Sequence, residues 1–218
     1  MFTGIIERTG RIVSLRDHGG VQRLTVAAPG IAGRLKEGDS LAVSGVCLTA
    51  LDIDPEYFHA DLAAETLSKT SLRSFIPGSL VNLELPMQAG APLGGHIVQG
   101  HIDGTGELIA LEPVAPGQPE TDWWVTIRVP EALRQYMVPK GSVAIEGVSL
   151  TIAAVSDDTI RIAILPLTYV RTNLHSLKPG SPVNIEADVL MKLAVRRTET
   201  ENQTEFELTE TWLVANGY

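Results

Sequence analysis

The sequence predicts an all-β protein of two tandem, homologous antiparallel barrels followed by a helix. Aromatic residues make up only 5% of the 218 residues, whereas 20 glycines and 13 prolines suit short strands joined by tight turns. The chain also repeats itself: residues 38–50 and 140–152 share a Gly-Val-x-Leu-Thr run, in which Ser149 stands where the first copy has Cys47. These observations predict two domains that share one frame and differ at one potentially reactive atom.

The leading segment of each copy is the first repeated element. Residues 2–15 (FTGIIERTGRIVSL) return as residues 98–111 (VQGHIDGTGELIAL), a displacement of 96 positions, whereas Cys47 and Ser149 are 102 positions apart. Six additional residues must therefore fall between these landmarks in the second copy. The Pro- and Gly-rich stretch 113–120 is the predicted insertion, because surface loops absorb insertions at small cost.

Short helices and strands follow in each copy. Helices are predicted at residues 29–35 and 130–137, the second with Pro130 at its first position. Alternating or continuous apolar runs predict strands at residues 57–62 and 159–165.

The last repeated block, residues 65–84 and 167–186, completes the duplication. A period of about 100 residues fits a tandem domain better than a solenoid unit. Each copy offers about six short strands, for which a closed or nearly closed antiparallel barrel removes exposed edges. The predicted units are residues 1–96, residues 97–188 and a helical segment at residues 189–218.

The tail belongs to neither copy. Its apolar residues recur at helical spacing: Val189, Leu190, Leu193 and Ala194. A polar interval follows, and then a stretch with Thr209 as a candidate N-cap and Gly217 as a candidate C-terminal stop. The apolar stripe of such a helix needs a cover, and a partner subunit is the simplest one.

Composition and charge restrict the function. The formal charge of −9 and the lack of any Lys/Arg cluster argue against nucleic acid as a partner. A single cysteine cannot form an internal disulfide, and the chain shows neither a signal-peptide pattern nor an apolar run of about 20 residues. We therefore expect a cytoplasmic protein that does not enter membranes.

The motifs, in their order and spacing, resemble the riboflavin synthases of the two-barrel, homotrimeric kind over essentially the whole chain. The strings that carry the resemblance are MFTGI, GVCLT, GGHIVQGHIDGTG, GVSLT, RTNL and VNIEAD. The resemblance implies two six-stranded Greek-key barrels and a reaction without metal, nucleotide or redox cofactor. In that reaction, two molecules of 6,7-dimethyl-8-ribityllumazine exchange a four-carbon unit to give riboflavin and a ribitylamino-pyrimidinedione.

The resemblance also implies where the reaction takes place. Two copies of one substrate need two similar pockets, and in the family these face each other between the first barrel of one subunit and the second barrel of its neighbour. The methyl protons of the lumazine are unusually acidic, so that positioning, hydrogen bonding and exclusion of water are the expected tasks of the protein. Whether the trimer associates with lumazine synthase stays open.

Site residues are carried over from the family position by position. The first pocket would be lined by Phe2, Gly4, Ile5, Ile6, Cys47, Leu48, Thr49, Asp61, Leu62, Ala63, Ala64, Glu65 and Thr66. The second would be lined by Gly100, His101, Ile102, Lys140, Ser149, Leu150, Thr151, Ala163, Ile164, Leu165, Pro166 and Leu167. The candidate catalytic residues are Cys47, His101, Ser149, Ser40, Lys140 and Asp188, with Glu146 as a further ligand contact.

Three positions depart from the family pattern. Glu146 stands where an Asp is more usual, Ser44 where Asn is commoner, and Leu167 where a polar residue often follows the proline. The first two preserve polarity and change only side-chain reach. At Leu167 a polar contact with the ligand would have to come from the neighbouring backbone.

Each candidate also has a purely structural interpretation. A free cysteine such as Cys47 is usually a small buried side chain, but its counterpart Ser149 favours a ligand-facing position for both. We hypothesise that Cys47 and Ser149 activate and hold the lumazine at its C7 carbon, and that His101 binds or transfers a proton. His96 is interpreted as structural. Lys140, Glu146 and Asp188 have solvated surface charges as their alternative.

Two other functions are weighed against synthesis of riboflavin. A Cys/His hydrolase lacks support, because no strained nucleophile turn or helix start follows Cys47. A non-catalytic lumazine- or flavin-binding protein would keep the barrels and lose the chemistry, but such proteins tend to lose the second-barrel residues. Here both repeated motifs are intact, together with His101 and Lys140.

Overall fold

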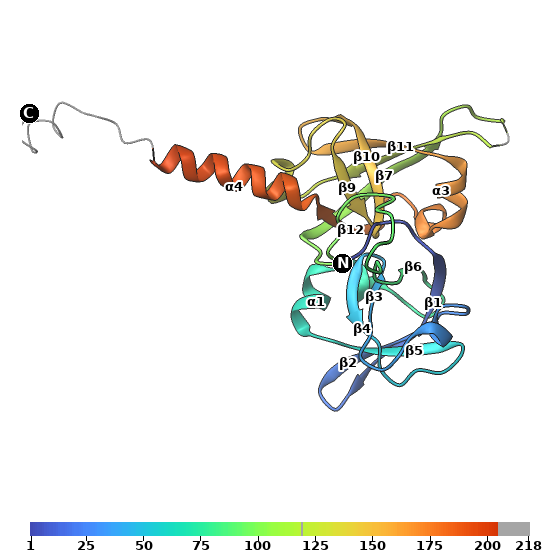
Figure 1. The fold of residues 1–218 in the computed structure, drawn as a ribbon. Helices are drawn as coiled ribbons and strands as arrows, with labels where there is room; N and C mark the ends of the chain where they lie inside the picture. The colour runs from blue at the N-terminus through green and yellow to red at the C-terminus, as the bar shows by residue number, and fades with distance from the viewer. Residues whose placement is uncertain (119, 205–218) are drawn as a thin grey trace, which may run out of the picture.

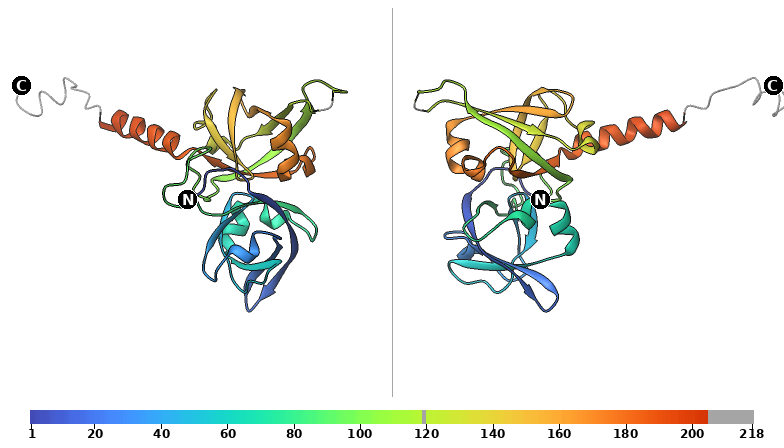
Figure 2. Two further views of the ribbon diagram at one scale, coloured as in Figure 1. Left: turned by 45° about the vertical axis from the view of Figure 1, so that its right-hand side comes forward. Right: turned by 180° about the vertical axis from the view of Figure 1, so that it is seen from behind.

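The computed structural model describes residues 1–118 and 120–204, and it shows two six-stranded antiparallel sheets, one above the other (Figure 1). In further views of the molecule, the last helix again extends away from both sheets (Figure 2). The predicted all-β fold, with two repeated six-stranded units and a following helix, is confirmed, and the second unit is a closed barrel.

The first sheet has the strand order β4-β3-β6-β1-β2-β5. Strand β5 alternates between core and surface, as period-two segments do: Phe58, Ala60 and Leu62 are buried and the residues between them face outward. The strands are β1 (Arg8–His18), β2 (Val21–Ala27), β3 (Ser40–Val43), β4 (Val46–Thr49), β5 (Tyr57–Leu62) and β6 (Leu80–Glu84).

The second sheet closes into a barrel with the cyclic order β10-β11-β8-β7-β12-β9, which matches the first sheet strand for strand. Its connection between β7 and β8 contains the predicted insertion: the corresponding turn of the first copy is only Gly19–Gly20. The strands are β7 (Gly104–Pro113), β8 (Trp123–Arg128), β9 (Ser142–Ile145), β10 (Val148–Val155), β11 (Thr159–Ile164) and β12 (Pro182–Ala187).

The two copies differ in how completely they close. In the second, β10 runs on and pairs with β11 from Ile152 to Val155. In the first, β4 ends at Thr49, and a single bridge between Leu51 and His59 joins the two ends of the sheet. The backbone of Asp52 has a φ of 43°, a left-handed conformation that ends the ladder at this point.

Short helices cover the barrel ends. The helices expected at residues 29–35 and 130–137 are shorter than predicted, and Pro130 is the N-cap of α2 rather than its first residue. The helical segments are η1 (Ala32–Arg34), α1 (Ala64–Lys69), η2 (Ser71–Ser74), α2 (Glu131–Arg134), α3 (Pro166–Arg171), η3 (Asn173–Ser176) and α4 (Val189–Thr204).

Helix α4 continues through the polar interval that was expected to interrupt it. The candidate cap Thr209 and stop Gly217 lie outside the described residues. Among the described helices, none is long and apolar enough to cross a bilayer.

A buried polar network joins the barrels across an approximate two-fold relation. The Nδ2 of Asn82 donates to the carbonyl of Glu146 at 2.8 Å, and the Nδ2 of Asn184 donates to the carbonyl of Ser44 at 2.9 Å. Its side chains are at most 1% exposed: Ser44, Ser71, Asn82, Glu146, Asn173 and Asn184. Because every unpaired group here would be costly, the network fixes the barrels relative to one another.

Candidate functional site

The leading segments of the two copies cross between the barrels. Phe2 and Val98 form an antiparallel bridge, with N···O distances of 2.7 and 3.1 Å. Beyond the bridge, the carbonyl of Gly100 accepts the backbone N–H of Cys47 at 2.9 Å, and the carbonyl of Gly4 accepts that of Ser149 at 2.8 Å. Cys47 of the first barrel and Ser149 of the second therefore each lie against the leading segment of the other copy.

This crossing corrects the predicted grouping of the pocket residues. Gly4–Ile6 were expected beside Cys47 and residues 100–102 beside Ser149, but the structure exchanges them. Ile6 packs against the core of the second barrel and Ile102 against that of the first. The two segments are alike in sequence, so that either fits either barrel, and only the tertiary structure distinguishes the two arrangements.

The crossing depends on glycine at its two closest points. Gly100 has a φ of +82°, and a Cβ on it would lie 2.6 Å from the Cβ of Cys47 and 2.9 Å from the ring of Phe2. Gly4 has a φ of +74°, and a Cβ on it would lie 2.6 Å from the Cβ of Ser149. Any larger residue would push the segment away from the pocket it lines.

Replacing Gly100 with Ala is expected to lower the free energy of unfolding by roughly 2–4 kcal/mol, because backbone strain and overpacking add. Urea denaturation measures this loss. Gly180→Ala is the matched control, since Gly180 has a φ of +89° but nothing within 4 Å of its Cβ position. Equal losses in the two variants would show that the close approach at Gly100 contributes nothing.

The first pocket has a volume of about 330 Å³ and brings Cys47 together with His101. On β4, Cys47 and Thr49 face outward while Val46 and Leu48 point into the core. The lining residues are Val46, Cys47, Ala63, Glu65, Thr66, Lys69, Thr70, Gly100, His101 and Ile102. Ser40 pairs with Thr49 across the strands, and Ala64 is exposed at the start of α1, close to the lining residues in sequence.

Four predicted pocket residues have their side chains in the barrel cores instead. The alternation along each strand turns them inward, so that only their backbone is available to a ligand. These residues are Leu48, Leu62, Leu150 and Ile164.

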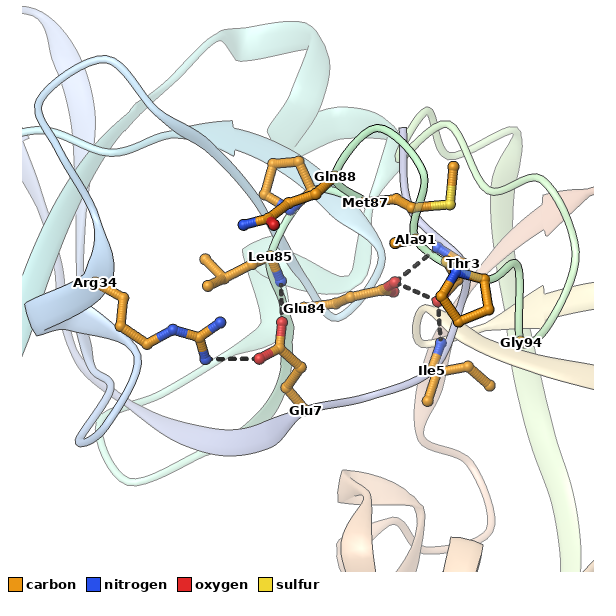
Figure 3. Close-up of a pocket in the computed structure, with 12 residues that line it drawn as sticks. Thr3, Ile5, Glu7, Arg34, Glu84, Leu85, Met87, Gln88, Ala91 and Gly94 are labelled. Atoms are coloured by element: carbon orange, nitrogen blue, oxygen red, sulfur yellow. Dashed lines mark hydrogen bonds and ion pairs between the residues drawn. The ribbon is translucent and has the colours of Figure 1, made fainter.

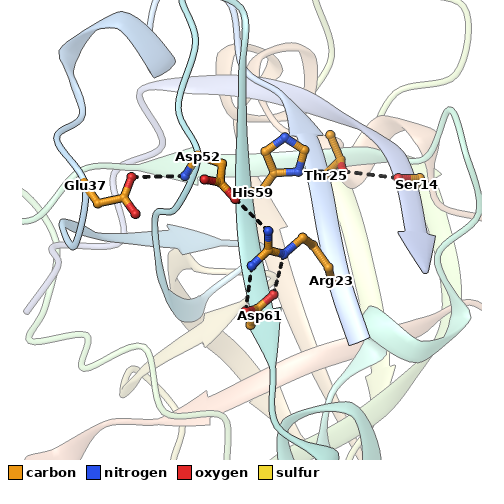
Figure 4. Close-up of polar contacts among 7 residues, drawn as sticks. All are labelled: Ser14, Arg23, Thr25, Glu37, Asp52, His59 and Asp61. Atoms are coloured by element: carbon orange, nitrogen blue, oxygen red, sulfur yellow. Dashed lines mark hydrogen bonds and ion pairs between the residues drawn. The ribbon is translucent and has the colours of Figure 1, made fainter. Parts of the chain in front are cut away.

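Asp61, another predicted ligand contact, is held by Arg23 on the neighbouring strand (Figure 4). Two bonds of 2.7 and 2.9 Å join the guanidinium to the Asp61 carboxylate, and a third of 2.6 Å joins it to Asp52. The hydrogen bond from Arg23 lowers the pKa of Asp61. The carboxylate is therefore already bound by a cation in the protein.

The second site centres on Ser149, whose Oγ lies 2.7 Å from the Nδ1 of His96. His96 is 8% exposed, and its Nε2 is buried without a hydrogen-bond partner in the described part of the chain. Burial lowers the pKa of His96, against the opposing charge of Asp188. A neutral imidazole at this position can accept the Ser149 proton.

The other residues predicted for the second site are mostly exposed residues of the second barrel. Thr151 is exposed on β10. Lys140 is exposed on a turn, and its backbone N–H donates to the carbonyl of Ile152. Leu165 and Leu167 are 63% and 62% exposed. Ala163 is exposed on β11 and Pro166 is half-buried at the start of α3.

Asp188 begins α4, and its Oδ1 accepts the N–H of Leu190 at 2.9 Å. Its position places one negative charge near His96.

Glu146 does not fit its predicted role as a ligand contact, because it is fully buried in the network between the barrels. Its Oε1 accepts the N–H of Asn184 at 2.7 Å and the hydroxyl of Ser71 at 3.2 Å, and its Oε2 accepts from Asn173 at 2.8 Å. Burial raises the pKa of Glu146, although these donors oppose the rise.

Sequence reasoning interpreted His96 only as structural and gave no role to Glu84 and Glu186. Glu84 and Glu186 each accept two backbone N–H groups of a leading segment, and burial raises the pKa of both carboxyls. The repeated Val-Asn-x-Glu that ends each copy was a usable signal for the two glutamates. In the described ranges, no three His, Cys, Asp or Glu side chains are grouped as a metal site requires.

Known proteins are similar to this chain in sequence and in fold. The lumazine binding domain matches residues 3–86 and 99–188. The riboflavin synthase of Bacillus subtilis (strain 168) is 38% identical over 220 residues, covering 100% of both chains. That of Actinobacillus pleuropneumoniae is 42% identical over 88% of this chain and 87% of its own. The solved structure of LumP complexed with riboflavin has a TM-score of 0.77 and 29% identity, covering 86% of this chain and 99% of LumP.

Proposed function

The chain belongs to the riboflavin synthase family of transferases, and from this premise we propose that its two outer pockets hold two molecules of 6,7-dimethyl-8-ribityllumazine. A four-carbon unit passes from one molecule to the other. The products are riboflavin and 5-amino-6-(D-ribitylamino)uracil, and the exchange needs no external oxidant or reductant.

One observation carries the proposal: the same outward-facing position of each barrel holds a potentially reactive side chain against the crossed leading segment. Cys47 occupies it in the first barrel and Ser149 in the second. A reaction between two copies of one molecule needs two similar but unequal sites, because one copy donates carbon and the other accepts it. The repeated frame supports the similarity, and the Cys/Ser difference supports the inequality.

The side chains divide into reacting and positioning groups. In the first pocket, His101 transfers a proton and Cys47 contacts the lumazine ring at C7. In the second, Ser149 contacts the ring at C7, and His96 acts as the base for Ser149. Thr66 and the outward Thr49 and Thr151 hydrogen-bond the pyrimidinedione edge, and Lys140 reaches the ribityl hydroxyls.

The two sites meet between neighbouring subunits of a homotrimer. Support comes from α4, which leaves the barrels with Leu190 and Leu193 61% and 59% exposed, and from the exposed leucines at α3. A second chain covering these side chains would remove apolar surface from water. The proposed compartment is the cytoplasm, given the single cysteine.

A non-catalytic binder is the second candidate, because LumP structures contain bound lumazine or riboflavin. The likeness is weaker, at 28–29% identity against 36–42% for riboflavin synthases. The paired Ser149 and His96, which a binder would not need, also favour the enzyme.

The deciding experiment incubates the protein with 6,7-dimethyl-8-ribityllumazine and follows riboflavin absorbance. Cys47→Ala and His101→Gln are each expected to slow turnover at least about tenfold. Tight binding of the lumazine without turnover by the unaltered protein would establish the binder instead.

A further inference from the structure

Each barrel fastens its leading segment by the same set of carboxylate bonds. In the first clasp, Glu84 accepts the N–H of Thr3 at 2.6 Å and Glu7 accepts the N–H of Leu85 at 3.2 Å (Figure 3). Glu84 also accepts the N–H of Gly4 at 3.0 Å. Both ends of the short segment are therefore tied to the last strand of its barrel.

The second clasp repeats this pattern at the corresponding positions. Glu186 accepts the N–H of Gln99 at 2.6 Å and of Gly100 at 2.9 Å, and Asp103 accepts the N–H of Ala187 at 2.8 Å. The backbone connections of the two clasps are thus equivalent.

The clasps differ in the origin of their cation. Glu7 pairs with Arg34 at 2.7 Å, a residue of η1 in the same barrel, and the two side chains are 35% and 54% exposed. Asp103 pairs with Lys192 of α4, whose Nζ lies 2.9 and 2.7 Å from its two carboxylate oxygens. This second pair is only 22% and 24% exposed, so that it is less weakened by solvent.

The segment held by the second clasp forms a wall of the first pocket. Gly100, His101 and Ile102 line that pocket, and the carbonyl of Gly100 bonds to the N–H of Cys47. Two residues after His101, Asp103 is bound by α4. A chain of direct contacts therefore runs from the helix that leaves the barrels to the side chains of the first pocket.

We propose that Asp103 and Lys192 are positioning residues, which fix residues 99–103 and so couple the seating of α4 to the placement of His101 beside Cys47. The proposal rests on the function proposed above for its effect on turnover. Its structural part, the coupling of Lys192 to His101, stands independently.

The test compares Lys192→Met with Lys192→Arg, which keeps the charge, and with Arg128→Met. Arg128 bonds to Glu107 and Asp158 on the surface of the same barrel, with about half of its side chain exposed, and serves as the matched control. Lys192→Met is expected to shift the NMR resonances of the His101 ring and to lower kcat by about tenfold to a hundredfold. Lys192→Arg should recover most of both effects.

Asp103→Asn should act like Lys192→Met, and combining the two should add little, because both remove one interaction. Sedimentation of each variant records its assembly. If Lys192→Met loses turnover while the His101 resonances match those of the Arg128→Met control, the effect belongs to assembly and the coupling is overturned. If the unaltered protein makes no riboflavin but Lys192→Met still shifts His101, the proposed function fails and the coupling stands.

Discussion

Replacing Glu146 with Ala is expected to lower the free energy of unfolding by about 3–5 kcal/mol, among the largest effects of any single substitution in this chain. The carboxylate accepts bonds from Asn184, Ser71 and Asn173, all at most 1% exposed. Removing it takes the acceptor from the buried Asn184 N–H and Ser71 hydroxyl, weakens the bonding of Asn173, and opens a cavity between the barrels.

Urea denaturation followed by fluorescence measures the loss. Glu107→Ala is the control, because Glu107 is a half-exposed carboxylate in a surface ion pair, for which a change within about 0.5 kcal/mol is expected. A loss of the same small size at Glu146 would mean that the network does not hold the barrels together.

The pH dependence of this contribution has a definite sign. Burial raises the folded-state pKa of Glu146 above its ordinary value of 4.5. Its contribution to stability is therefore complete below about pH 4.5 and is lost as the pH rises through the folded-state pKa. The uncharged variant Glu146→Gln lacks this loss, so that its stability relative to the unaltered protein should improve between pH 5 and pH 8.

The sequence was sufficient for the fold because the duplication is long and its register is unambiguous. Two copies of the same strand pattern leave few architectures other than two equivalent barrels, and the repeated motif located Cys47 and Ser149 on matching strands. The six-residue difference between the copies was also enough to place the insertion.

What the sequence could not provide is information about contacts between distant segments. The leading segments cross between the barrels, and because the two segments are similar in sequence, comparing the copies could not predict which barrel each one contacts. Arg23 reaches Asp61 across a strand pairing whose partners are 38 residues apart. Glu146 lies beside the repeated motif in the sequence, but its side chain is fully buried and bonds to residues of both copies.

His96 was missed for a related reason. It precedes the second copy and has no counterpart at the start of the first, so that comparing the copies gave no signal at this position. Only the structure shows that the linker brings its ring to the Oγ of Ser149.

Replacing Ser149 with Ala is expected to lower kcat for riboflavin formation by about 10²–10³-fold. The Ser149 hydroxyl is 2.7 Å from the Nδ1 of His96, the distance of a short hydrogen bond, and sits at the position that matches Cys47 in the first barrel. Loss of the hydroxyl removes the group that the imidazole can activate, while the backbone bond from Ser149 to Gly4 is kept.

His96→Gln should reduce kcat by a similar factor, and the double variant should be little worse than either single one, because the two side chains act as a unit. Since burial lowers the pKa of His96 below 6.5, the ring is neutral at pH 7. Turnover should fall only as the pH drops toward the lowered pKa of His96. This acid limb should vanish in His96→Gln. Ser181→Ala, next to a surface turn where the hydroxyl accepts the N–H of Lys178, is the control. Full activity in Ser149→Ala, or losses that simply multiply in the double variant, would show that these two side chains do not act together.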